Sequence, residues 1–147
     1  MLGVGSPAFR ITLSSTHDAV ALAAGDLDGN ADLDTGEDLV VAARGQGQVL
    51  LFRNAGGGSF ALPPEVPATA DGPVSVRVVD VASDLDRDVV VAAEAEGGLF
   101  WLENRDGSGL SWRKWIIDGA APGVRDVVSA LTTTGVTLFA AVSGANE

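Results

Sequence analysis

The feature that most constrains the fold of this chain is an internal repeat of about 50 residues. The segment Asp38–Ala43 (DLVVAA) returns as Asp88–Ala93 (DVVVAA), and Val49–Asn54 (VLLFRN) returns as Leu99–Asn104 (LFWLEN). Both pairs are 50 residues apart. Fixed periods of this length indicate architectures in which one supersecondary unit is repeated and each unit packs against its neighbours. We therefore expect stacked copies of a single unit.

The apolar segments within each repeat are short and rich in β-branched residues, and Gly, Asn and Asp bound them. This pattern favours β-strands over helices, and near-continuous apolar character indicates strands covered on both faces. Four strands per repeat, stacked blade on blade, is typical of a β-propeller. We therefore predict an all-β partial propeller, with strands at 20–24, 39–43, 48–53, 60–62, 74–81, 88–93, 99–104, 112–117, 124–131 and 136–142.

The repeat also predicts how the 147 residues are divided. Weaker copies flank the clear pair, since Val124-Arg125 and Ala140-Ala141 each follow a similar dipeptide by 48 residues. We expect one propeller segment made of the end of a preceding blade, two whole blades and the first half of a further blade, at 1–19, 20–70, 71–122 and 123–147. A propeller needs at least about four blades. Two outcomes are open: the chain is an excerpt of a longer propeller, or copies of it associate. We predict a homo-oligomer whose copies together complete the propeller.

The charge of the chain excludes some partners. Twenty acidic residues against nine basic ones leave a formal charge of −11, which repels nucleic acid and anionic membrane surfaces. There is no cysteine, the start of the chain lacks the pattern of a signal peptide, and no apolar run approaches the roughly 18 residues of a membrane span. We expect no nucleic-acid binding and no membrane insertion.

The acidic residues are concentrated in one loop, which carries six carboxylates within the thirteen residues 26–38. Such crowding is unfavourable without a counter-charge, and a hard divalent cation prefers six to eight oxygen ligands. The oxygen-bearing residues alternate along the loop, which suits calcium, and the absence of cysteine argues against zinc or copper. The candidate ligands are Asp26, Asp28, Asn30, Asp32, Asp34 and Asp38.

The loop and the glycine-rich turn after residue 53 resemble the blade signature of the FG-GAP/VCBS repeats of integrin-like propellers. The resemblance implies Ca²⁺ held by Asp26, Asp28, Asn30, the carbonyl of Asp32, and Asp34. Four additional residues, 35–38, depart from the family pattern, so that either Asp34 or Asp38 holds the last ligand position. For relatives of this kind the resemblance implies an extracellular or cell-surface location and adhesion-like recognition of a protein or glycan ligand.

The second repeat keeps a reduced version of this loop. Asp80, Asp84 and Asp88 hold three of the ligand positions, but Ala82 replaces a carboxylate and Arg87 adds a positive charge. These residues form a weaker second candidate calcium site, because each lost charged ligand lowers the affinity. In the third copy the corresponding positions are Val128, Thr132 and Val136, and no metal is expected.

Two other interpretations of the first loop stay open. Its ligand spacing also fits an EF-hand, although Ala31 stands where the sharp turn requires glycine and the following segment is β-branched. The loop is alternatively an acidic, solvated loop without metal.

We expect a binding module and no enzyme activity, because His17 is the only histidine and no nucleophile or phosphate-binding motif accompanies it. Trp101 and Trp112 align with Leu51 and Phe60, which predicts core positions for both. Trp115 lacks such a counterpart and, three residues from Trp112, lies on the other face of its strand. Trp115 is therefore the candidate ligand contact. An accessory propeller domain of a secreted carbohydrate-active enzyme is the alternative function.

Overall fold

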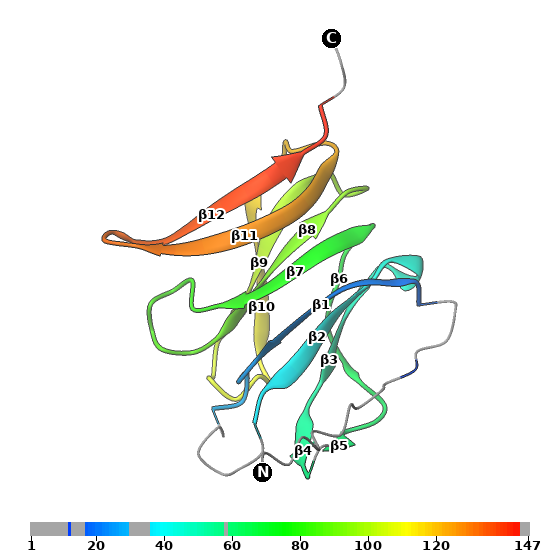
Figure 1. Ribbon diagram of the computed structural model, residues 1–147, viewed down its shortest axis with the longest axis vertical. Helices are drawn as coiled ribbons and strands as arrows, with labels where there is room; N and C mark the ends of the chain where they lie inside the picture. The colour runs from blue at the N-terminus through cyan, green and yellow to red at the C-terminus, as the bar shows by residue number, and fades with distance from the viewer. Residues whose placement is uncertain (1–11, 13–16, 30–35, 58, 145–147) are drawn as a thin grey trace, which may run out of the picture.

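The computed structural model describes residues 12, 17–29, 36–57 and 59–144 of the chain. These residues form four antiparallel β-sheets, two with four strands and two with two strands (Figure 1). The all-β, partial-propeller prediction is confirmed. Among the described residues, no helix is long and apolar enough to cross a membrane.

The first four-stranded sheet, here called the first blade, has the order β1-β2-β3-β6. Its strands are β1 (Ala19–Gly25), β2 (Asp38–Ala43), β3 (Gln48–Phe52) and β6 (Glu65–Thr69). A short 3-10 turn (Arg44–Gln46) joins β2 to β3, and the small hairpin β4 (Asn54–Gly56) and β5 (Ser59–Phe60) lies between β3 and β6.

The second blade repeats this arrangement in the order β7-β8-β9-β10, and the third consists of one hairpin. The strands are β7 (Pro73–Val79), β8 (Asp88–Ala93), β9 (Gly98–Asn104) and β10 (Trp112–Asp118), then β11 (Val124–Thr132) and β12 (Gly135–Val142). The strand register also repeats, because Val40 pairs with Leu51 as Val90 pairs with Trp101. The 50-residue sequence repeat is thus a structural repeat.

Alternating side chains place the hydrophobic core between the blades. One face of the first blade packs on the facing side of the second through a cluster that includes Leu27, Val40, Leu51, Val91 and Phe100. The opposite face of the second blade packs on β11 through a second cluster that includes Val90, Leu99 and Val127. Each fully buried side chain of this size contributes about 1.5–3 kcal/mol. Stacking of neighbouring sheets therefore supplies the main stabilising contacts.

The inner strands of adjacent blades approach closely at a glycine. A Cβ placed on Gly25 of β1 would clash with Cγ1 of Val78 on β7. A side chain at this position would separate the two strands, so glycine permits the close blade packing. In Figure 1, β1, β7 and β11 run side by side, with the β11–β12 hairpin at one end of the stack.

The fourth strand of the first blade differs from the prediction. We predicted it at 60–62, but β6 begins only at Glu65. Pro63 and Pro64 intervene, and because proline has no backbone N–H it cannot donate to the sheet ladder. The aligned aromatics nevertheless hold matching places, because Phe60 pairs with Asn54 as Trp112 pairs with Asn104.

Candidate functional site

Three of the predicted calcium ligands come together at the loop between β1 and β2. One carboxylate oxygen each from Asp26, Asp28 and Asp38 lie within 4.8 Å of one another. Oxygens that share one Ca²⁺ at about 2.4 Å are at most about 4.8 Å apart, so the three side chains fit the ion. The other predicted ligands, Asn30, Asp32 and Asp34, lie outside the described residues.

Asp38 is the buried member of this group, at the first position of β2. Its Oδ2 accepts a hydrogen bond from the backbone N–H of Leu27 (3.1 Å), and its Oδ1 accepts one from Asn54 (2.8 Å). Burial raises the pKa of this carboxyl above its ordinary value, and the two backbone donors oppose that rise. The two backbone N–H groups therefore fix the orientation of the Asp38 carboxylate.

Asp88 plays the same part in the second blade. Its two oxygens accept hydrogen bonds from the backbone N–H groups of Val81 (2.9 Å) and Asn104 (2.9 Å), and burial likewise raises its pKa. The sequence left Asp34 and Asp38 as alternatives for the last ligand position. By its hydrogen bonds Asp38 is the equivalent of Asp88, and among the described residues it lies with Asp26 and Asp28. Asp34 lies outside the described residues.

The carboxylates of the second candidate site are not brought together. Asp80 accepts hydrogen bonds from the backbone N–H groups of Asp84 (3.2 Å) and Leu85 (3.0 Å), and Asp84 accepts one from Asp86 (3.1 Å). Within the described part of the chain, only the first loop places three carboxylates within coordination distance of one another. The loop of the second blade is thus organised around its own backbone.

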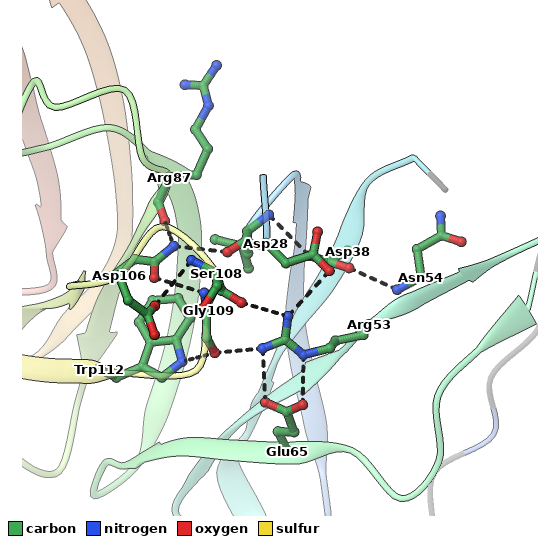
Figure 2. A network of polar contacts seen from close by, with 12 residues as sticks. Asp28, Asp38, Arg53, Asn54, Glu65, Arg87, Asp106, Ser108, Gly109 and Trp112 are labelled. Atoms are coloured by element: carbon green, nitrogen blue, oxygen red, sulfur yellow. Dashed lines mark hydrogen bonds and ion pairs between the residues drawn. The ribbon is translucent and has the colours of Figure 1, made fainter. Parts of the chain in front are cut away.

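A guanidinium group lies beside the first loop. Arg53 pairs with Glu65 through two hydrogen bonds (2.7 and 3.3 Å), and its Nη1 lies 3.4 Å from Oδ2 of Asp28 (Figure 2). It also donates to the backbone carbonyls of Ser108 (3.0 Å) and Gly109 (2.7 Å) in the second blade. The hydrogen bond with Glu65 raises the pKa of Arg53, so the group stays charged. Arg53 therefore joins the acidic loop to the neighbouring blade.

Asn104 makes the complementary connection from the second blade. Its Nδ2 donates to the carbonyl oxygens of Leu27 (2.9 Å) and Arg87 (3.2 Å), and its Oδ1 accepts from the N–H of Gly109 (3.0 Å). The side chain of Leu27 is itself buried in the cluster between the blades. The acidic loop is consequently anchored in the second blade by side chain and backbone together.

Asn54 and Asn104 hold matching positions in the repeat, but the bond that Asn104 makes to the first blade was missed in the sequence analysis. Asn54 forms two bonds within its own blade, donating to the carbonyl of Glu37 (3.1 Å) and accepting from the N–H of Gly56 (2.9 Å). Recurrence of asparagine 50 residues apart was the available signal. Arg53 had no such signal, because Glu103 stands at the matching position.

The tryptophans separate onto two faces of the second blade. Trp112 packs against the core between the first two blades, and its Nε1 donates to the carbonyl of Gly109 (2.7 Å). Trp115 is 40% exposed and stacks on Trp101 with ring centroids 6.3 Å apart. The guanidinium of Arg113 lies 3.8 Å from the Trp115 ring centroid. Trp101, predicted as core, is only half-buried, whereas its counterpart Leu51 is 1% exposed.

The flanks of the first loop decide one of the open alternatives. The loop follows β1 and precedes β2, which pair with each other in an antiparallel sheet. An EF-hand requires a helix on each side of the loop. The first candidate site is therefore a loop between two blade strands and is not an EF-hand.

Comparison with known proteins agrees with this geometry. Residues 32–91 match the family described as FG-GAP-like repeat, from the middle of the first acidic loop into β8. No curated protein and no solved structure matches the chain. The match confirms the resemblance drawn from the loop and the glycine-rich turn.

Proposed function

Because residues 32–91 carry an FG-GAP-like repeat within stacked four-stranded sheets, we propose that the chain is a calcium-stabilised propeller module that recognises a protein or glycan. The observation that carries the calcium proposal is the convergence of Asp26, Asp28 and Asp38 at the loop between β1 and β2. Asn30, Asp32 and Asp34 would complete the oxygen ligands, as the family pattern implies.

The charge balance of the loop supports a bound cation. Arg53 is the positive group 3.4 Å from Asp28, and it is also engaged by Glu65. The carboxylates of Asp26, Asp28 and Asp38 lie within 4.8 Å of one another, and a bound cation would offset their mutual repulsion. Calcium supplies two positive charges and accepts carboxylate ligands in flexible geometry. Extracellular calcium modules bind with dissociation constants of about 10⁻⁴–10⁻³ M, which suits a protein that acts outside the cell.

The test compares thermal unfolding in calcium and in EDTA. An ion that binds only the folded chain at 100 times its dissociation constant adds about 2.7 kcal/mol to the free energy of unfolding. At about 2–4 °C per kcal/mol for a chain of this size, the melting temperature rises by roughly 5–11 °C. Asp28→Ala is expected to remove most of the rise.

Asp84→Ala is the matched control, because it removes an exposed carboxylate from the corresponding loop of the second blade. This variant is expected to retain the calcium-dependent rise. Identical melting curves of the unsubstituted chain in calcium and EDTA would refute the calcium proposal. An equal loss of the rise in both variants would place the ion elsewhere.

The recognition proposal is supported by the Trp101–Trp115 pair. Exposed aromatic faces bind sugars and anchor protein partners, and Trp115 is exposed while braced by Trp101 and hydrogen-bonded to Glu103 (2.8 Å). A glycan array and a pull-down from extracellular extracts distinguish the two ligand classes. Glycan binding lost in Trp115→Ala would favour the accessory domain of a carbohydrate-active enzyme. Retained binding in that variant would remove Trp115 from the site.

A further inference from the structure

The outward face of the first blade is buried on β2 and β3 but exposed on β1. Leu22 on β1 pairs with Val41, and Val41 pairs with Leu50, so the three side chains share the face that points away from the second blade. Leu50 is 1% exposed, whereas Leu22 is 68% exposed. Val76 holds the place of Leu22 in the second blade, where it pairs with Val91, and it is completely buried by the first blade. Leu22 thus lacks the cover that its equivalent has.

The face of the second blade that points away from the first blade is buried on its inner strands and exposed on its outer strand β10. Its inner residues Val90 and Leu99 are buried against β11. Its outer residue Trp115 stays exposed, and the buried Nε1 of Trp101 has no hydrogen-bond acceptor among the described residues. The outer half of this face therefore also lacks a cover.

The β11–β12 hairpin presents a third apolar surface. Val127 is fully buried against the second blade, so its neighbour Val128 points the other way. Val128 pairs with Phe139 of β12, and these side chains are 45% and 55% exposed. This hairpin provides the inner two strands of a blade, and Val128 and Phe139 lie on the face opposite to the one that packs on the second blade.

We propose that a second copy of this chain docks head to tail, with Val128 and Phe139 of one copy packed on Leu22 of the other. The interface continues one already present, because within the chain one face of each blade packs on the opposite face of its neighbour. A repeat carries both complementary faces, and this chain exposes one at each end of its described stack. The second copy is therefore the occupant whose surface matches.

The proposal rests on the stacked-blade fold and not on bound metal. The formal charge of −11 opposes self-association. At about 0.15 M salt the screening length is about 8 Å, so only charges close to the interface repel each other appreciably. Packing of apolar side chains then decides whether the copies associate. Measurements in calcium and in EDTA separate this inference from the calcium proposal, since either can fail alone.

The test measures molar mass by light scattering at 10–100 µM and 0.15 M salt (about physiological ionic strength). The expected mass is at least twice the 14.9 kDa of one chain. Leu22→Glu and Phe139→Glu are each expected to give monomers with unchanged far-UV circular dichroism, because both side chains are largely exposed in the isolated chain. Leu110→Glu, on an equally exposed leucine (72%) of the β9–β10 loop, is expected to stay associated.

Mixing the two monomeric variants gives the decisive result. A head-to-tail contact between a Leu22→Glu chain and a Phe139→Glu chain can use the intact Phe139 of the first and the intact Leu22 of the second. The mixture is therefore expected to form a one-to-one pair, whereas each variant alone does not associate. A monomeric unsubstituted chain, variants that still associate, or a mixture that stays monomeric would each overturn the proposal.

Discussion

Substitution of Asn104 tests the view that the first loop is anchored in the second blade. The side chain is 1% exposed and makes three hydrogen bonds, one of them to Leu27 of the first blade. Asn104→Ala leaves these buried backbone groups without their partner. At about 1 kcal/mol net for each bond, we expect the free energy of unfolding to fall by about 3 kcal/mol. For a chain of this size the melting temperature falls by roughly 6–12 °C.

Asn54→Ala is the matched control, since Asn54 holds the same place in the first blade. It makes two local side-chain bonds, to Glu37 and Gly56, and is less buried. We expect a loss of about 1–2 kcal/mol. Urea unfolding in EDTA, followed by tryptophan fluorescence, measures both values without a contribution from bound metal. Equal losses in the two variants would refute the reasoning, because the bond to the neighbouring blade would then contribute nothing.

Two further predictions concern other parts of the chain. The hydrogen bond from Ser75 holds the pKa of Asp126 below its usual 3.8. The ionised carboxylate therefore stabilises the fold fully above pH 3.8, and this stabilisation is lost as the pH falls through the lowered pKa. The free energy of unfolding in urea is measured for the unsubstituted chain and for Asp126→Asn between pH 5 and 2, about the acid range of carboxyl titration. The difference between the two chains is expected to shrink as the pH falls. A difference that stays constant over this range would contradict the prediction. Leu85 is 90% exposed at φ 78°, so Leu85→Gly is expected to raise the free energy of unfolding by about 0.5–1 kcal/mol, whereas Leu110→Gly lowers it.

The repeat made most of the fold predictable. Strands such as β2 and β8 follow from short apolar runs between turn residues, and their 50-residue spacing was visible in the repeat. The fourth strand of the first blade was misplaced because the repeat alignment ends at Phe60, and Pro63-Pro64 delays strand pairing to β6. Local proline chemistry outweighed the alignment at this position.

The candidate site was predictable in its ligands but not in its surroundings. Carboxylates alternate along the chain, so Asp26 and Asp28 were visible from spacing alone. The contacts of Arg53 with Ser108 and Gly109 join residues 55 and 56 positions apart. Such contacts depend on how two blades are stacked, which a pattern within one blade does not contain. Trp101 was misjudged for the same reason, since its burial depends on the neighbouring sheet.

Anchoring of the two acidic loops has a consequence for how new sequence can be added to this fold. In the first blade the backbone N–H of Leu27 donates to Asp38, 11 residues further along the chain, and in the second blade the N–H of Val81 donates to Asp88, 7 residues further along. Loop closure depends weakly on length, at about 0.6 kcal/mol per doubling. A foreign peptide grafted between Leu27 and Asp38 would therefore be displayed on a frame that already tolerates two loop lengths.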